Sequence, residues 1–235
     1  MNYWKLFSKL LDDKNDTNIV SILCYWYTKQ ELCIRWLTSL SSSFTMGNGT
    51  RQGGILSPYL FSRYIRELLL ELETSRVGCN IGGIFINVLA YADDIVILTP
   101  SCRGLQQLLS VLYKHSTNVD MTCNYKKTVC MVFKPKLRIK IVADVFPQFS
   151  LGTNLLQFVT EFKYLGHVIT DNLTDDADMQ QEVRNQFVRT NILRRRFYKC
   201  SVAVKRILFK SYCISLYDAA LWSRYNKGSL RKLSS

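Results

Sequence analysis

The sequence has 235 residues, a length that fits one large domain or a domain with an appendage. Hydrophobic residues make up 48% of it and charged residues 21%, so the chain has enough apolar material for a sizeable core and is not mainly disordered. The formal net charge is +13, an excess that favours polyanionic partners.

The basic charge is concentrated near the C-terminus. Residues 1–178 carry 18 basic and 16 acidic side chains, whereas residues 179–235 carry 13 and 2. We therefore expect the surface that meets a polyanion to lie mostly in the C-terminal part.

Cysteine and histidine offer little chemistry in this sequence. The eight cysteines form no C-x-x-C pair, and His115 and His167 stand alone, so buried reduced thiols are expected rather than a zinc site or a disulfide framework. The first residues lack the pattern of a signal peptide, and the longest apolar stretch, Ile84–Leu98, is interrupted by Asp93 and Asp94. We expect an intracellular protein, nuclear or cytoplasmic, with no membrane segment.

The first elements expected in chain order are two short helices. Apolar residues recur at helical spacing over residues 4–11 and 19–27, on either side of a polar break. Leu32, Ile34 and Trp36 then alternate with other residues, a serine-rich turn follows at 41–43, and residues 44–46 can pair back. This pattern predicts a hairpin that leads into a flexible stretch.

A longer helix and a second hairpin are expected next. Ser57 can cap a helix that has Pro58 at its first position, and an apolar stripe continues this helix to about Ser75. Residues 84–91 and 95–98 are rich in β-formers and predict a hairpin whose turn contains Asp93 and Asp94.

The remaining elements are read from periodicity and composition. Residues 105–113 favour a helix, and residues 129–133 and 137–142 favour strands. From Asp178 the pattern is helical and basic, through 191–197 and then 202–222, followed by a polar basic tail. The shift in composition near 173–177 indicates a domain boundary.

Asp93 and Asp94 are the sharpest chemical feature. Two carboxylates held close together repel by roughly 1 to 4 kcal/mol at 4 Å, and a bound divalent cation would reverse that penalty. Mg²⁺ takes oxygen ligands, and in two-metal sites it stabilises both the attacking and the leaving oxygen of a phosphoryl displacement. The alternative is that both residues only form the turn, which aspartate favours in any case.

The loop before the long helix is the second feature. Arg51 and Gln52 offer a cation and an amide, and Gly53 and Gly54 let the backbone approach a ligand closely. This composition suits a nucleotide or a template strand lying against the loop. A hairpin exit that needs glycines only for its backbone geometry would look the same.

Together the two segments are more specific than either alone. The octet Arg51–Pro58, the following Leu60-Phe61 and the Y-A-D-D sequence at 91–94 resemble the reverse transcriptase family, specifically its non-LTR, LINE-like branch. The resemblance extends to an N-x-x-K-[TS] segment at Asn124–Thr128 and to residues 162–166, which look like the primer-grip hairpin. It covers roughly residues 2–225.

The resemblance implies an α+β fold. It implies an antiparallel polymerase palm sheet with flanking helices, followed by a helical thumb. By this similarity, residues 1–145 are a partial palm, residues 146–172 contain the primer grip, and residues 173–235 form a basic helical thumb.

The resemblance also implies roles for individual residues. Asp93 and Asp94 would bind Mg²⁺, as two ions and with Mn²⁺ as a substitute, and Lys127 would protonate the leaving pyrophosphate. Arg51, Gln52, Gly53 and Gly54 would position the template and the incoming nucleotide. Tyr164, Leu165 and Gly166 would hold the primer end. For Lys127 a solvated lysine, and for the hairpin ordinary packing, remain open alternatives.

The sequence departs from the family pattern at its start. The family's other metal-binding aspartate lies in an A-F-D segment upstream of a stretch resembling residues 3–10, and Met1 falls after that point. We therefore expect an N-terminally truncated domain that lacks the fingers. Asp12 and Asp13 are interpreted as residues at a helix end, because nothing in the sequence directs them at Asp93.

The C-terminal cations are the expected contact with the nucleic acid backbone. They alternate with aromatic residues that would pack the thumb or stack on bases. A solvated basic face on a packed helix pair is the alternative. The cations with this expected role are Arg194, Arg195, Arg196 and Lys199.

Two functions follow from these observations. The first is a fragment of a reverse transcriptase whose parent extends a DNA primer on an RNA template from deoxynucleoside triphosphates, with the fragment inactive alone. The second is a non-catalytic, nucleic-acid-binding palm and thumb remnant of a retrotransposon. Template preference, a linked endonuclease, the host and the oligomeric state have no signal in the sequence.

Overall fold

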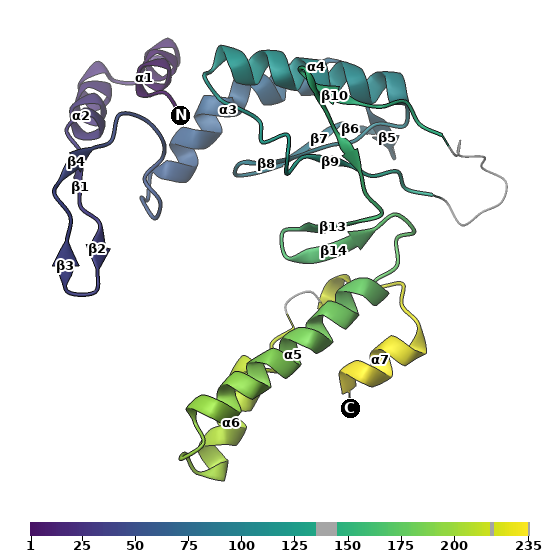
Figure 1. The fold of residues 1–235 in the computed structure, drawn as a ribbon. Helices are drawn as coiled ribbons and strands as arrows, with labels where there is room; N and C mark the ends of the chain where they lie inside the picture. The colour runs from purple at the N-terminus through teal and green to yellow at the C-terminus, as the bar shows by residue number, and fades with distance from the viewer. Residues whose placement is uncertain (135–144, 217–218, 235) are drawn as a thin grey trace. The chain divides into compact units, whose positions relative to one another are not determined.

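The computed structural model describes residues 1–134, 145–216 and 219–234. It is a mixture of helices and small sheets and divides into two compact units (Figure 1). The first unit contains Met1–Thr128 and Phe146–Leu156, and the second contains Val129–Val145 and Gln157–Ser235. The strand expected over residues 137–142 lies outside the described residues.

Two helices open the first unit, as the periodicity predicted. Helix α1 spans Tyr3–Asp12, and the Asn2 side chain caps it by accepting hydrogen bonds from the Trp4 and Lys5 backbone nitrogens. Helix α2 spans Thr17–Thr28 and is capped by Asp16, which accepts from the Asn18 nitrogen.

These two helices pack with α3, which spans Ser57–Thr74. Their shared core is fully apolar and aromatic, and burying each large side chain contributes about 1.5 to 3 kcal/mol. Its buried members are Tyr3, Leu6, Phe7, Leu10, Val20, Tyr27, Leu60, Tyr64 and Ile65.

The buried face of the opening helices differs from the predicted stripe. Trp4, Ile22 and Trp26 belong to the apolar pattern but are largely exposed. The sequence is apolar on more than one face of each helix, so periodicity alone could not identify the face that packs against α3.

The expected hairpin at 31–46 is present, but its turn lies elsewhere. Strand β1 (Glu31–Leu32) pairs with β4 (Phe44–Thr45), and β2 (Arg35–Trp36) pairs with β3 (Ser39–Leu40), all antiparallel. The chain reverses next to Leu37, which has a positive φ of 55°. The serines at 41–43 instead interrupt the returning strand, where the Ser41 hydroxyl accepts a hydrogen bond from the Ile34 nitrogen.

Helix α3 begins and ends where predicted, but Ser57 does not cap it. The N-cap residue is Leu56, which makes no side-chain hydrogen bond, and Pro58 lies in the first turn. The Ser57 hydroxyl donates to the Arg51 carbonyl at 2.5 Å instead. The serine therefore closes the preceding loop.

The middle of the first unit contains four strands and a helix. Strands β5 (Cys79–Ile81) and β6 (Ile84–Ile86) form one antiparallel pair, and β7 (Val88–Tyr91) and β8 (Asp94–Ile97) form another. Helix α4 spans Cys102–Asn118, longer at both ends than its predicted core. It packs on α3, and the pair β10 (Ser150–Leu151) and β11 (Asn154–Leu155) contacts it.

The single β-run predicted for residues 84–91 is divided at Asn87. This buried side chain donates hydrogen bonds to the Leu72 carbonyl and the Ser75 hydroxyl, and its backbone carbonyl accepts from the Leu98 nitrogen. Strands β5 and β6 therefore form a separate hairpin, and β7 begins as a new strand after Asn87.

The second unit begins with short strands. Strand β9 (Val129–Cys130) is shorter than predicted and pairs in parallel with β12 (Gln157–Phe158). Strands β13 (Glu161–Tyr164) and β14 (His167–Thr170) form an antiparallel hairpin. Within the described ranges, strands pair only two by two, and the antiparallel palm sheet stays a prediction.

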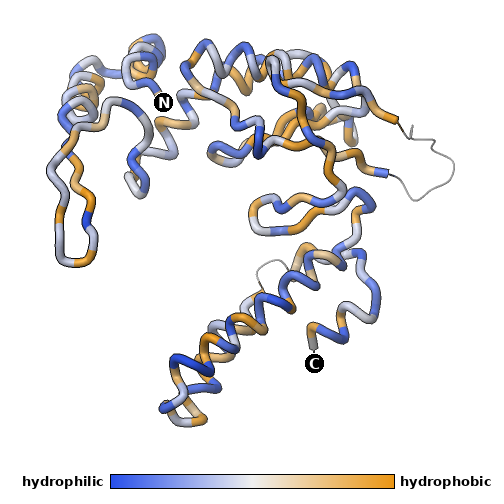
Figure 2. The backbone as a smooth tube through the Cα atoms, viewed as in Figure 1, coloured by the Kyte–Doolittle hydropathy of each residue, from blue (hydrophilic) through white to orange (hydrophobic). Residues whose placement is uncertain are grey.

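Helices complete the second unit. Helix α5 spans Asp176–Arg196 as one continuous element, and Figure 2 shows that it carries mainly hydrophilic residues. Helix α6 spans Val202–Tyr212, ten residues short of the predicted end, and a 3₁₀ turn follows at Ala219–Leu221. The expected polar tail contains α7, Lys227–Ser234. Across the described ranges, no helix is both long and apolar enough to cross a membrane.

Candidate active site and nucleic-acid interface

Asp93 and Asp94 lie at the exposed tip of the β7–β8 hairpin. Tyr91 pairs with Asp94, so Ala92 and Asp93 form the connecting turn and Asp94 is the first residue of β8. Ala92 has a positive φ of 52°, a conformation that glycine adopts more easily. Both carboxylates are exposed to solvent, and a cation or a phosphate could reach them.

The donor set at this turn suits Mg²⁺ in part. Two adjacent carboxylates are what a protein supplies when substrate phosphates and water complete the coordination. In the part of the chain that the structure describes, no group of three or more acidic, histidine or cysteine side chains could hold a metal. The turn therefore offers two of the carboxylates that a two-metal centre requires, and no third joins them here.

The Asp13 carboxylate is paired with an arginine and is not part of the Asp93–Asp94 turn. It forms an ion pair with Arg63 of α3, whose hydrogen bond lowers the pKa of the carboxyl. Its backbone lies at the C-cap of α1. This confirms the interpretation of Asp13 as a residue at a helix end.

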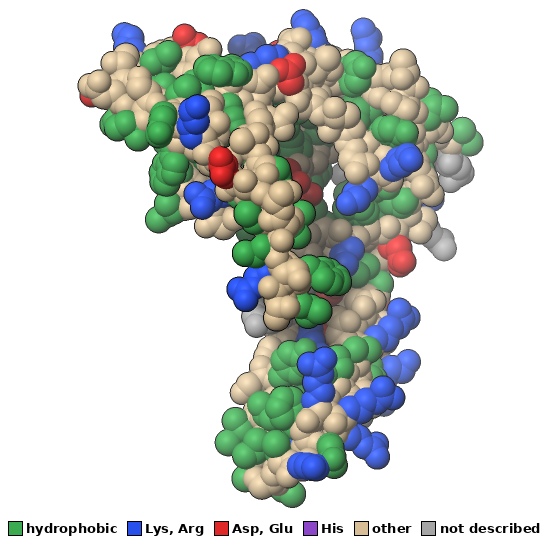
Figure 3. All heavy atoms as spheres, turned by 60° about the vertical axis from the view of Figure 1, so that its left-hand side comes forward, with side chains coloured by type: hydrophobic (Ala, Val, Ile, Leu, Met, Phe, Trp, Pro, Cys, Tyr) green, Lys and Arg blue, Asp and Glu red, His purple; other side chains and the backbone are tan. Residues whose placement is uncertain are grey.

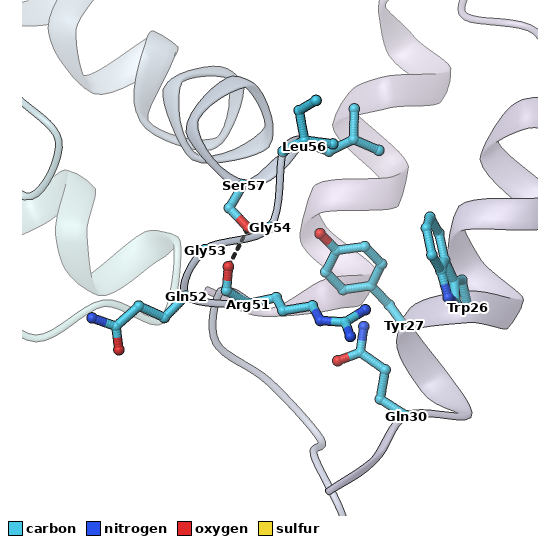
Figure 4. Close-up of a pocket in the computed structure, with 10 residues that line it drawn as sticks. Trp26, Tyr27, Gln30, Arg51, Gln52, Gly53, Gly54, Leu56 and Ser57 are labelled. Carbon is cyan, nitrogen blue, oxygen red and sulfur yellow. Dashed lines mark hydrogen bonds between the residues drawn. The ribbon is translucent and has the colours of Figure 1, made fainter.

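The loop before α3 borders a pocket of about 370 Å³. Figure 4 shows the Arg51 side chain directed toward Gln30 and Tyr27 of the pocket, whereas Gln52 points the opposite way. Gly53 has φ of 79°, and the Gly54 nitrogen donates to the Arg51 carbonyl at 3.0 Å. The loop is therefore a tight turn that presents Arg51 and Gln52 on different sides.

The two predicted halves of the site do not share this pocket. Its lining residues include Arg51, Gln52, Gly53 and Gly54 but neither Asp93 nor Asp94. A common groove between the aspartates and the loop remains a prediction.

The Asn124–Thr128 segment forms a tight turn before β9. The Asn124 carbonyl accepts hydrogen bonds from the Lys127 and Thr128 nitrogens, and its side-chain oxygen also accepts from the Lys127 nitrogen. The Thr128 hydroxyl donates to the same carbonyl at 2.9 Å. These bonds explain the spacing of the motif, and they leave the Lys127 side chain exposed.

The hairpin at 161–170 is as the sequence predicted. Tyr164 pairs with His167, so Leu165 and Gly166 form a two-residue turn, with φ of 48° and 99°. Positive φ at both central residues matches the twist of the flanking strands. Tyr164 is half-buried and Leu165 is exposed.

The basic residues at the end of α5 are accessible. Arg194, Arg195 and Arg196 form the last turn of α5, where cations also favour the helix dipole, and all three are exposed. Lys199 lies over the Tyr198 ring, 5.6 Å from its centroid. Figure 3 shows Lys and Arg side chains gathered along one side of this helical region, with hydrophobic side chains on another.

An acidic anchor in the second unit was not predicted. Asp178, 1% exposed, accepts hydrogen bonds from the Val168 nitrogen and the Trp222 indole. Asp175 accepts from the Ser223 and Arg224 nitrogens. These residues attach the C-terminal segment to the start of α5, and their only signal in the sequence is a run of aspartates before a basic helix.

Two pocket residues were also missed. Trp26, in the last turn of α2, and Gln30, two residues beyond that helix, line the pocket beside Arg51. Trp26 belongs to an apolar stripe in the sequence, and no signal there separates an exposed tryptophan from a buried one at helical spacing.

Comparison with known proteins found a matching family model and several relatives. A family model described as reverse transcriptase (RNA-dependent DNA polymerase) matches residues 8–169, more than half of the chain. This range contains the Arg51–Gly54 loop, both turn aspartates, Lys127 and the 162–166 hairpin.

Individual relatives agree with the family model. The Pol polyprotein from type-2 retrotransposable element R2DM of Drosophila melanogaster is 31% identical over 129 residues, 54% of this chain and 12% of that protein. The Pol polyprotein from type-1 element R1 2 of Nasonia vitripennis is 23% identical over 205 residues, 77% of this chain and 46% of the relative. The RNA-directed DNA polymerase from mobile element jockey of Drosophila funebris is 27% identical over 199 residues, which are 76% of this chain and 20% of the relative. The chain thus spans less than half the length of each.

Proposed function

Because the chain belongs to the reverse transcriptase family, in its non-LTR retrotransposon branch, we propose that it supplies palm and thumb residues for extending a DNA primer on an RNA template. The observation that carries the proposal is the exposed Asp93–Asp94 turn at the tip of β7–β8, inside the range that the family model matches. The parent reaction consumes deoxynucleoside triphosphates and releases pyrophosphate.

The turn aspartates are the proposed metal ligands. Asp93 and Asp94 would hold Mg²⁺, or Mn²⁺ in its place, through their carboxylate oxygens. When bound, two such ions activate the attacking 3′-hydroxyl and stabilise charge on the leaving oxygen. The two carboxylates repel each other without a cation, so cation binding also stabilises the turn.

The other predicted residues have positioning or proton-transfer roles in this proposal. Gln52, Gly53 and Gly54 contact the template and the incoming nucleotide, and Arg51 adds a cation to the same loop. Lys127 is exposed on a rigid turn, from which it would donate a proton to pyrophosphate. Tyr164, Leu165 and Gly166 hold the primer end at the tip of the β13–β14 hairpin.

The proposed division into regions follows the family resemblance. Residues 1–145 form a partial palm, residues 146–172 contain the primer grip, and residues 173–235 form a helical thumb. The exposed arginines at the end of α5 support a thumb that contacts nucleic acid through phosphates.

We further propose that residues 1–235 alone do not polymerise. Two-metal transfer needs more carboxylate ligands than the Asp93–Asp94 pair, and the described residues bring no third one to it. Every 1.36 kcal/mol of lost transition-state stabilisation lowers the rate tenfold. The exposed cations support a second function that survives this loss, namely binding of nucleic acid without catalysis.

Two parallel assays of the 235-residue polypeptide test these proposals, using a DNA primer annealed to an RNA template. We expect the hybrid to bind in a fluorescence anisotropy titration, and we expect no primer extension above the level of an Asp93→Ala variant. Absence of hybrid binding would contradict the palm and thumb assignment. Robust Mg²⁺-dependent extension that Asp93→Ala abolishes would contradict the proposed inactivity.

A further inference from the structure

The pocket beside the Arg51–Gly54 loop combines groups that recognise an unpaired nucleotide. One side is the C-terminal end of α2, with Trp26 and Tyr27, followed by Gln30, and the other is the loop itself (Figure 4). From this arrangement we infer that the pocket binds one base of a single strand, stacked on Trp26, with its phosphate near Arg51. The inference rests on the proposed function and adds a ligand and two residues to it.

Trp26 provides the stacking surface. Its side chain is 53% exposed although it lines a pocket, so the indole has a free face. An aromatic face that is open to solvent is what an unpaired base can cover, and such stacking tolerates any base.

Tyr27 provides a rigid wall next to it. Its ring makes edge-to-face contacts with Tyr3 and Phe7, at centroid distances of 5.1 and 6.3 Å. These contacts fix the end of α2 on the core of the first unit, so the pocket is formed before a ligand arrives.

Two polar groups in the pocket are available to a ligand. Counting only described residues, neither the Arg51 guanidinium nor the Gln30 amide has a hydrogen-bonding or ion-pairing side-chain partner. Arg51 supplies a cation for a phosphate, and Gln30 supplies a donor and an acceptor for the edge of a base. Both side chains point into the same space in Figure 4.

The glycines allow the strand to approach closely. A Cβ atom at Gly54 would lie 2.8 Å from the Ser57 hydroxyl and 3.1 Å from the Arg51 carbonyl. Only glycine therefore fits at this position without displacing its neighbours. Gly53 has a positive φ and open space beside it.

A strand suits this pocket better than the reacting nucleotide does. Neither Asp93 nor Asp94 lines the pocket, so a triphosphate there would not meet the proposed metal ligands. One arginine matches a single phosphodiester rather than a triphosphate. The nucleotide bound here is therefore an unpaired one that has not yet reached the reacting position.

Anisotropy titrations with a short single-stranded RNA and a blunt RNA–DNA hybrid test the inference. Trp26→Ala should weaken binding of the single strand by about tenfold, because stacking of one base is lost. It should leave binding of the hybrid unchanged. Trp26→Phe should restore most of the affinity, which separates stacking from damage to the fold. Trp4→Ala is the matched control, since Trp4 is similarly exposed on α1 and does not line the pocket.

An RNA with abasic nucleotides completes the design. It should bind the parent and Trp26→Ala equally, since no base remains to stack. Equal affinity of the parent and Trp26→Ala for the intact RNA would overturn the inference, as would a Trp26→Ala effect that persists with the abasic RNA. Failure of the blunt hybrid to bind would instead count against the proposed function, so the two failures are distinguishable.

Discussion

Ala92 precedes the two candidate metal ligands and has a strained backbone conformation. Its φ of 52° lies in the left-handed region, where a residue with a Cβ atom is less stable by roughly 1 to 2 kcal/mol. Strain of this kind often accompanies functional turns, because it fixes the direction of neighbouring side chains. Here the neighbours are Asp93 and Asp94.

Replacing Ala92 by glycine should therefore stabilise the chain. We expect the free energy of unfolding to rise by up to about 1 kcal/mol in urea titrations, since relief of strain exceeds the added entropy of the unfolded glycine. Ala90→Gly, in the same strand, is the control and should lower stability. A loss of stability in Ala92→Gly would show that this turn carries no strain.

The lowered pKa of Glu67 predicts that the contact between α1 and α3 weakens in acid. Burial alone would raise the pKa of this carboxyl, but hydrogen bonds from Lys9 and Arg63 outweigh it and lower the pKa from 4.5 to about 2. A lowered pKa in the folded state stabilises the fold above pH 4.5, and this contribution is lost as the pH falls toward 2. Because Glu67 is partly exposed, its contribution is reduced by solvent screening.

The corresponding measurement is the free energy of unfolding between pH 5 and pH 2. Glu67→Gln should show a shallower loss of stability over this range than the parent. Glu73→Gln, on the same helix, should behave like the parent because Glu73 is exposed. Identical pH profiles for the parent and Glu67→Gln would exclude this network as a source of acid sensitivity.

Elements with a complete local signal were predicted from the sequence, and elements that depend on distant partners were not. Helix α3 has Pro58 in its first turn and an apolar stripe, and the β13–β14 hairpin has its own turn residues, so the structure confirms both elements although Ser57 does not cap α3. The end of α6 and the presence of α7 were missed. Asp175 accepts from the Ser223 and Arg224 backbone nitrogens and Asp178 accepts from the Trp222 indole, across 44 to 49 residues, and no local pattern reports such a contact.

In the candidate site, too, residues with a local signal were predicted and residues that depend on distant contacts were not. The motif residues at 51–54, 91–94 and 124–128 could be recognised from the sequence because each is a short run of consecutive residues that resembles a family motif. Trp26 and Gln30 could not, since they meet Arg51 only through packing of α2 against the core.

The last turn of α5 should contribute to binding through phosphates alone. Each neutralised phosphate changes the slope of log K against log salt by about 0.9, so Arg194, Arg195 and Arg196 together would account for up to about 2.7 units. We expect the triple alanine variant to bind an RNA–DNA hybrid with a correspondingly shallower slope. The effect should not depend on base sequence.

Salt titrations with a fluorescent hybrid measure both slopes. Arg103→Ala is the control, because it removes an exposed cation from the first unit. Arg63→Ala is unsuitable, because Arg63 forms an ion pair that joins α3 to the end of α1. Equal slopes for the parent and the triple variant would assign these arginines to a solvated face without a ligand.

The chain consists of two units built from segments that interleave in sequence. Residues 146–156 belong with the N-terminal unit, where the Gln106 side chain pairs with the Ser150 backbone nitrogen and carbonyl at 3.0 Å. Composition along the chain could not reveal this, because the contact spans 44 residues.

The Asp93–Asp94 turn is the proposed binding site for the divalent cation of a polymerase. Replacing Mg²⁺ by Fe²⁺ in the presence of the primer–template hybrid, with ascorbate and peroxide, tests this binding, because radicals formed at the ion cut the nearby backbone. We predict cleavage close to residues 91–95 that is lost in Asp93→Asn and in Asp94→Asn and is retained in Asp12→Asn. Absence of cleavage at this turn, or cleavage that persists in both turn variants, would contradict the claim.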